Sequence, residues 1–259
     1  MAGGPHREEL AGARGRLPGP AQGGAGGGPG AGPARPAVLP FGLPVLDAHL
    51  PGGGLARGGL HELAGGGADA GFAAAGALFA AGILARLDGP ALWCLRLPDL
   101  YGPGLAAAGL RPERLLVAEA NSDAQVLAVL EEGLRHRALA AVVGEVARLG
   151  FTPSRRLQLA AEGSGVMALV LRRGPGLTAA AVAAQPSAAL TRWRITPLPS
   201  APLSLPGVGR ARWRLELLRC RGGEPASWIV EACDATGHLG LPADLADRPA
   251  APAPGRAAG

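Results

Sequence analysis

The chain has 259 residues, of which 48% are hydrophobic and 3% aromatic, so it can bury a core made mostly of Ala, Leu and Val. Glycine and proline, with 43 and 25 residues, fill about a quarter of the chain and place part of it in the composition range of disordered segments. Every basic side chain apart from histidine is Arg, because the sequence contains no Lys. The formal charge of +5 permits nucleic-acid binding without requiring it.

The cysteines and the apolar runs bear on the compartment. Cys94, Cys220 and Cys233 lie far apart and form no CxxC pair, which argues against a disulfide framework and a zinc site and favours a reducing compartment. The longest uncharged run, 70–85, has 16 residues and would span roughly 24 Å as a helix, short of a bilayer of about 30 Å. We therefore expect a cytoplasmic protein without a metal and without a membrane partner.

The composition predicts one domain with a tail at each end. Residues 1–36 contain almost no large apolar side chain and cannot bury enough surface to offset chain entropy, so we expect a disordered Gly/Pro-rich tail. Residues 247–259 have a similar composition and predict a disordered C-terminal tail. The domain between them covers 37–246, with a loop or linker at about 173–189.

The first part of the domain alternates strand-like and helix-like runs. Compact apolar runs predict strands at 59–65, 91–96, 115–120, 139–146 and 166–171, and helices are expected at 72–87, 123–137 and 152–162. Ser122 and Gln125 form a capping box for the second helix. Thr152 and Pro153 begin the third helix, and Gly163 ends it.

The last part of the domain changes in character. Three segments that each carry a Trp predict strands at 190–195, 212–218 and 227–232. Charged and apolar residues alternate in the second of them, as expected for an antiparallel strand with one solvated face. The whole order predicts an α/β fold with a mostly parallel central sheet flanked by helices and an antiparallel C-terminal extension.

The strand at 59–65 runs into glycines and opens a helix, the setting in which a P-loop, GxxxxGK[ST], cradles phosphates with backbone N–H groups. Gly65 or Gly66 takes the first glycine position of that motif and Gly71 the second, with Gly67 between them. These four glycines mark a degenerate nucleotide-loop position.

The chemistry of a P-loop is missing from this loop. Phe72 stands where the motif has its phosphate-binding Lys, and Ala73 stands at the Ser/Thr that would hold magnesium. No Lys elsewhere can substitute, because the chain has none. We therefore expect no cofactor, and ATP binding is not expected.

Two further residues are candidates for catalysis, Glu145 and His61. Glu145 follows the buried run LAAVV, where it could activate water or hold magnesium, or could be a solvated residue at the end of a strand. The second interpretation is favoured, because nothing positions a γ-phosphate. His61 lies inside an apolar strand beside Glu62, and a lone His there is more often packed or half-exposed than catalytic. We predict no catalytic residue.

An RWR triplet occurs twice in the C-terminal part. The candidate contacts for a partner or for DNA are Arg192, Trp193, Arg194, Arg212, Trp213 and Arg214. Arg beside an aromatic ring suits stacking on bases and contact with phosphate. Alternation in a strand instead puts Trp on one face and both Arg on the other, so a core Trp with solvated Arg is favoured. A third interpretation uses the Arg face to dock an acidic partner.

The order of these motifs resembles the RecA-like ATPase core, with an LD, PGGG and RG entry before the strand and its glycine loop. Within that superfamily the chain is similar to the ImuA family of RecA-like accessory proteins of bacterial inducible mutagenesis cassettes. The likeness runs from about Val38 to Pro249. The passages that carry it include LPFGLPVLDAHLPGGGLARGGLHELAG, GPALWCLRLPDLYGPGLAAAGLRPERLLVAEA, AVVGEVARLGFTPSRRLQLAAEGSGVMALVLRR and RWRLELLRCRGG.

The resemblance implies a role in DNA-damage-inducible (SOS) error-prone translesion synthesis. It implies an adaptor that bridges an ImuB-type Y-family polymerase homologue and an error-prone replicative-type polymerase, with RecA and single-stranded DNA as further candidate partners. One alternative is a DNA-dependent ATPase or recombinase-like enzyme with a degenerate P-loop. A second is an SOS cell-division inhibitor.

Overall fold

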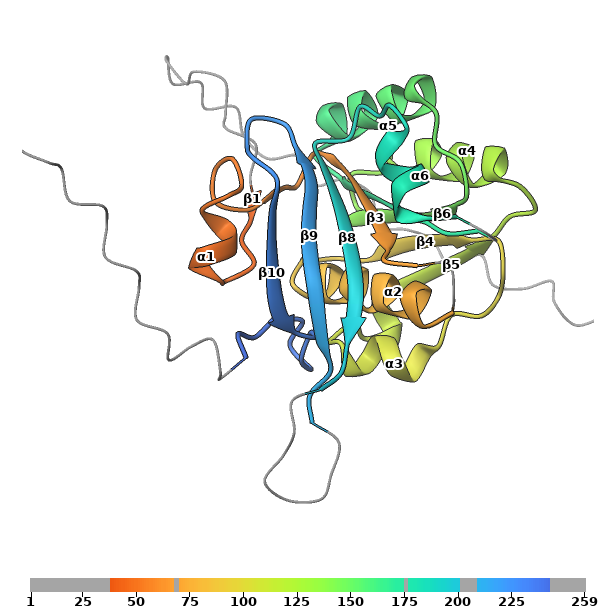
Figure 1. Ribbon diagram of the computed structural model, residues 1–259. Helices are drawn as coiled ribbons and strands as arrows, with labels where there is room; N and C mark the ends of the chain where they lie inside the picture. Colours follow the sequence, from red (N-terminus) through yellow and green to blue (C-terminus); the bar gives the residue numbers. More distant parts are fainter. Residues whose placement is uncertain (1–37, 68–69, 175–176, 201–208, 243–259) are drawn as a thin grey trace, which may run out of the picture. The chain divides into compact units, whose positions relative to one another are not determined.

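The structure is a computed structural model that describes residues 38–242 except 68–69, 175–176 and 201–208 (Figure 1). The tails expected at 1–36 and 247–259 lie outside the described residues. The strands are β1 (Val38–Leu39), β2 (Leu55–Ala56), β3 (Leu60–Gly65), β4 (Ala91–Leu95), β5 (Leu115–Glu119), β6 (Ala141–Val146), β7 (Met167–Arg172), β8 (Thr191–Leu198), β9 (Arg212–Cys220) and β10 (Ala226–Glu231). The helices are α1 (Pro44–Asp47), α2 (Ala70–Ala85), α3 (Gly102–Ala107), α4 (Asp123–Gly133), α5 (Phe151–Ser164) and α6 (Ala179–Ala184), with a 3-10 turn, η1, at Pro112–Arg114.

Eight strands form one mixed sheet in the order β10-β9-β8-β3-β7-β6-β4-β5, and β1 pairs with β2 in a separate two-stranded sheet. The strands from β8 to β5 in this order are parallel, whereas β9 pairs antiparallel with both β8 and β10. The α/β fold and its antiparallel C-terminal extension are therefore as predicted. Strand β8 joins the two parts, since one of its edges is parallel and the other antiparallel.

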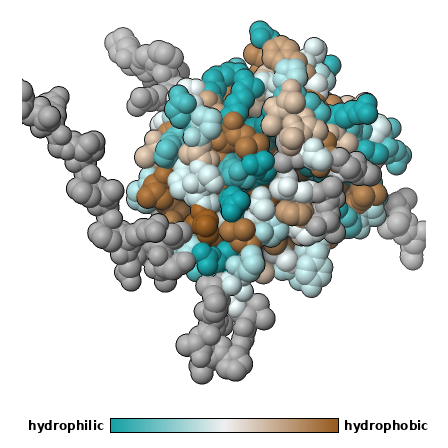
Figure 2. Space-filling model, in the orientation of Figure 1, coloured by the Kyte–Doolittle hydropathy of each residue, from teal (hydrophilic) through white to brown (hydrophobic). Residues whose placement is uncertain are grey.

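Two apolar layers lie on the two faces of the sheet. Strands β4 and β6 send alternate residues to opposite sides, so that Trp93 and Val143 pack with Phe79 of α2 while Cys94 and Val142 pack in the layer of α4 and α5. Helix α3 contributes to the α2 layer. In Figure 1 strands β8, β9 and β10 lie side by side at one end of the sheet, and α2 crosses the face of β8. Their outer surface in Figure 2 is a mosaic of hydrophilic and hydrophobic side chains.

The ends of the helices differ from the sequence prediction by a few residues. Helix α4 begins after Ser122, whose hydroxyl accepts from the Gln125 N–H at 3.3 Å, but the Gln125 side chain accepts from the N–H of Asn121 instead of closing a capping box. Helix α5 begins at Phe151, one residue before the predicted cap, and ends at Ser164, followed by the C-cap Gly165 with φ 79°. A left-handed residue at this position favours glycine, which explains why Gly165 and not Gly163 ends the helix.

A short helix lies inside the segment for which the sequence predicts a loop or linker, 173–189. Helix α6 follows Thr178, whose hydroxyl accepts a hydrogen bond from the Ala181 N–H at 3.2 Å. A Thr cap followed by a run of alanines satisfies the first turn and has high helix propensity. Val182 of α6 is buried.

Candidate functional site at the carboxyl edge of the parallel strands

The glycine loop leaves the carboxyl end of β3 and leads to α2. The Gly66 N–H donates to the carbonyl of Ile195 in β8 at 2.9 Å, so the loop is held against the neighbouring strand. A Cβ atom built at Gly66 would lie 2.1 Å from Thr196 Oγ1, and one at Gly67 would lie 2.4 Å from Cε2 of Phe72. Packing against protein atoms therefore already requires glycine at these positions.

Phe72, at the position of the P-loop lysine, turns its ring back over the glycine loop. A Cβ atom built at Gly65 would meet the Phe72 backbone and Cβ at 2.9 Å, and the ring lies against Gly67. Gly71 is exposed in the first turn of α2. The cavity left beside the loop, lined by Gly65, Gly67 and Arg172 among others, has a volume of about 30 Å³. Small-molecule sites usually measure about 300 to 1,000 Å³.

We expect Gly66→Ala to lower the free energy of unfolding by about 1 to 3 kcal/mol, because the added methyl overlaps Thr196. Urea denaturation measures the change. Gly76→Ala in α2 is the matched control: its Cβ meets nothing within 4 Å, and replacing Gly by Ala in a helix raises stability by up to about 1 kcal/mol. Equal effects of the two substitutions would contradict the packing explanation.

Glu145 is buried, with a relative exposure of 4%, so its interpretation as a solvated residue is wrong. Its Oε1 accepts from the Trp93 indole N–H at 2.9 Å, and its Oε2 accepts from Arg173 Nη1 at 2.9 Å. Arg173 also donates to Asp99 at 2.8 Å. Burial, followed by the charge of Glu145, raises the pKa of the Cys94 thiol. The carboxylate is thus occupied by two donors from neighbouring strands.

A second buried carboxylate was not picked out as a candidate from the sequence. Glu62 in β3 accepts from Arg172 of β7 at 3.1 Å and from Arg192 of β8 at 3.2 Å, and all three side chains are at most 4% exposed. Arg172 further donates to the side chain of Gln185 at 2.7 Å, and Arg192 donates to the Gln185 carbonyl at 2.8 Å. This ion triad, Arg172–Glu62–Arg192, ties three adjacent strands to the end of α6.

His61, next to Glu62, is also fully buried. Its Nδ1 lies 2.8 Å from Thr191 Oγ1 and its Nε2 lies 2.9 Å from the carbonyl of Ala56. Thr191 Oγ1 accepts from the Trp193 indole N–H at 2.8 Å, so its own hydrogen is available to His61 Nδ1. This network assigns the imidazole hydrogen to Nε2, which then donates to Ala56. Burial lowers the pKa of His61 to about 4, against a smaller opposing effect of the Ala56 carbonyl.

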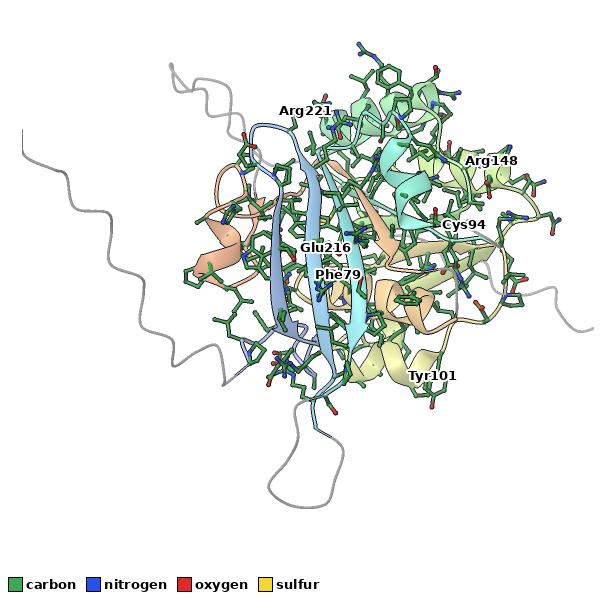
Figure 3. The ribbon with its side chains drawn as sticks, viewed as in Figure 1. Phe79, Cys94, Tyr101, Arg148, Glu216 and Arg221 are labelled. Carbon is green, nitrogen blue, oxygen red and sulfur yellow. The ribbon has the colours of Figure 1, made fainter. Side chains whose placement is uncertain are left out.

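The two RWR triplets place their aromatic rings in the core. Trp193 and Trp213 are 0% and 3% exposed and both lie near Phe79, so a base could stack on either ring only if the core opened. The prediction of core Trp rings is confirmed, but the prediction of solvated Arg is wrong for Arg192, which is buried by its ion pair with Glu62. Of the flanking residues, Arg192 belongs to the ion triad and Arg194 pairs with Glu216, which Figure 3 labels on the antiparallel strands.

The other two arginines of the triplets lie on β9. Arg212 is partly buried and Arg214 is exposed. The structure thus separates the six candidate contacts into buried and accessible side chains. Contact with a partner or with DNA at these positions remains a prediction, and it concerns the accessible arginines.

The residues that the structure describes contain neither a cluster of metal ligands nor a membrane-spanning helix. Among these residues, no group of three or more His, Cys, Asp or Glu side chains is arranged to hold a metal ion. Within the same ranges, none of the helices combines the length and the apolar character that a membrane span needs.

These observations define an α/β protein with a mainly parallel sheet, in which Gly66 and Gly67 after β3 pack closely against Thr196 and Phe72. No family model matches the chain. The chain belongs to the ImuA family: it is 41% identical over 211 residues to Protein ImuA of Caulobacter vibrioides strain NA1000 / CB15N, covering 78% of this chain and 85% of that protein. Protein ImuA of C. vibrioides strain ATCC 19089 / CIP 103742 / CB 15 gives the same identity and coverage.

Proposed function

We propose that this protein is a non-catalytic accessory protein of DNA-damage-inducible error-prone translesion synthesis, which acts in the cytoplasm. In this role it bridges an ImuB-type Y-family polymerase homologue and an error-prone replicative-type polymerase. Membership of the ImuA family supports a role in the ImuA/ImuB mutagenesis system. To this general role the proposal adds two details, the bridging of two polymerases and the identity of the second one.

The glycine loop is the feature that most favours an adaptor over an ATPase. Thr196 and Phe72 pack against Gly66 and Gly67, and Glu145 already binds Trp93 and Arg173. Without a cation and a metal ligand, nothing in the loop would position a γ-phosphate for attack. We propose that the fold is RecA-like and that its nucleotide position has lost the side chains that bind phosphate and magnesium.

A binding measurement tests the adaptor role. The full-length protein should bind the purified ImuB-type polymerase homologue of the same organism, and a complex with the error-prone polymerase should form only when all three proteins are mixed. Size-exclusion chromatography with light scattering reports both complexes. Absence of any complex with the ImuB-type protein would contradict the proposal.

A hydrolysis measurement tests the rival role as a DNA-dependent ATPase. We expect no phosphate release above background with single-stranded DNA. Hydrolysis that Glu145→Gln abolishes while the variant remains folded would favour the enzyme. A separate measurement tests the role as a division inhibitor. Overexpression of the protein in cells should leave cell length unchanged. Filamentation without a change in mutation rate would favour a division inhibitor.

A further inference from the structure

Helix α2 has an uncovered face that its composition does not lead one to expect. It contains no charged residue and is apolar on every side, as is typical of helices that are buried all round. Its second half is covered by the sheet and the C-terminal segment, and the residues from Phe79 to Leu84 are buried. In its first half, Ala74 is exposed and Ala77 and Leu78 are only partly buried.

The uncovered face forms one wall of a groove between α2 and α3, which we call the α2–α3 groove. The groove has a volume of about 290 Å³, and most of its lining is apolar, including Ala73, Ala77 and Leu78 of α2. Gly104 forms its floor on α3: a Cβ there would lie 3.0 Å from Tyr101 Cδ1 and 3.6 Å from Leu78 Cδ2. Small residues on both helices thus keep open a space about as large as one or two apolar side chains.

A large aromatic side chain lines this groove and is exposed to solvent. Tyr101 is 72% exposed and points outward beside α3 in Figure 3. An aromatic ring beside an apolar pocket is a frequent anchor of protein interfaces, because it buries much area at a low cost in side-chain entropy.

The polar end of the groove carries a negative charge. Asp99 and Arg173 both line the groove, and Arg173 is held between Asp99 and Glu145. Two carboxylates against one guanidinium leave one negative charge, and Asp99 is the member that is half-exposed to solvent. A basic group on a partner would compensate this charge.

We infer that the α2–α3 groove binds a segment of the ImuB-type polymerase homologue that presents an apolar or aromatic side chain next to a basic residue. The apolar side chain enters between Leu78 and Tyr101 over Gly104, and the basic residue pairs with Asp99. This inference rests on the proposed function. It assigns to the adaptor the surface by which it holds its partner, on the α2 side of the sheet.

The test compares the affinity of the full-length protein for the purified ImuB-type homologue with that of single variants, by isothermal titration calorimetry. Ala77→Phe fills the groove and Tyr101→Ala removes its wall, and each should weaken binding by about tenfold or more. Leu159→Ala on α5 is the control: Leu159 is 55% exposed but lies on the other side of the sheet, and its loss should change the affinity by less than about twofold. Asp99→Asn should make the affinity less sensitive to salt.

The outcomes separate the two proposals. If the unsubstituted protein does not bind the homologue, the proposed function fails and the groove inference fails with it. If it binds and both groove variants bind equally well, the groove inference alone is overturned. Because Tyr101 is largely exposed, Tyr101→Ala should keep the thermal unfolding temperature of the parent even where Ala77→Phe does not. Weaker binding by Tyr101→Ala at an unchanged unfolding temperature therefore reports a lost contact and not a loss of folding.

Discussion

Replacing Glu62 by Ala is expected to lower the free energy of unfolding by about 3 to 5 kcal/mol. The reason is that Arg172 and Arg192 would remain buried with their common counter-charge removed. Burial already lowers the pKa of Arg172, with Glu62 opposing this effect. Without Glu62, the free-energy cost of burying the charged Arg172 guanidinium would lose its main compensation.

Urea denaturation followed by circular dichroism measures the effect, and Glu62→Gln provides a second variant that keeps the shape and one acceptor oxygen. The matched control is Glu216→Ala, which removes the carboxylate that pairs with Arg194 on the partly solvated face. Pairs of this kind contribute about 0 to 1 kcal/mol. A cost for Glu62→Ala no larger than that of the control would contradict the role given to the ion triad.

The second large effect is a loss of stability in mild acid that depends on His61. In the folded protein its pKa is lowered to about 4, whereas the unfolded chain has the ordinary value of 6.5. The unfolded state therefore binds a proton as the pH falls below 6.5, while the folded state stays neutral until about pH 4. The stabilisation by neutral His61 is complete above pH 6.5 and decreases by about 3 kcal/mol by pH 4.

Denaturation curves at several pH values between about 4 and 8 measure this slope. His61→Gln should be less stable than the parent at pH 8, because it cannot reproduce both hydrogen bonds to Thr191 and Ala56, but it should show a shallower dependence on pH. An unchanged slope in that variant would show that other groups carry the acid sensitivity.

The fold could be predicted from the sequence because its strands are short apolar runs between clear helix and turn signals. The run LAAVVGEV illustrates this: β6 is buried at every residue. The short helix α3 was missed, since GPGLAA combines glycine and proline with few apolar residues. Its one buried residue, Leu105, packs in the apolar layer of α2, a contact between distant segments that the local pattern does not show.

The sequence predicts only those parts of the candidate site whose residues lie close together in the chain. The glycine loop and the missing Lys can be found by position alone. The partners of Glu62 lie 110 and 130 residues away in the chain, so no spacing rule joins them. Glu145 is similar: its burial depends on Trp93 of the neighbouring strand and on Arg173, and the sequence shows neither proximity.

The ion triad has a further consequence for how the sheet assembles. Strands β3, β7 and β8 form the middle of the sheet, and β7 is rich in Ala, Leu, Met and Val, so several alignments between neighbours would bury similar apolar area. A slip by one residue turns every side chain of a strand to the opposite face. Such a slip, or one of two residues, would leave a guanidinium or the carboxylate of Glu62 without its counter-ion inside the protein. We therefore expect the charged trio to favour the observed alignment of these strands over shifted ones.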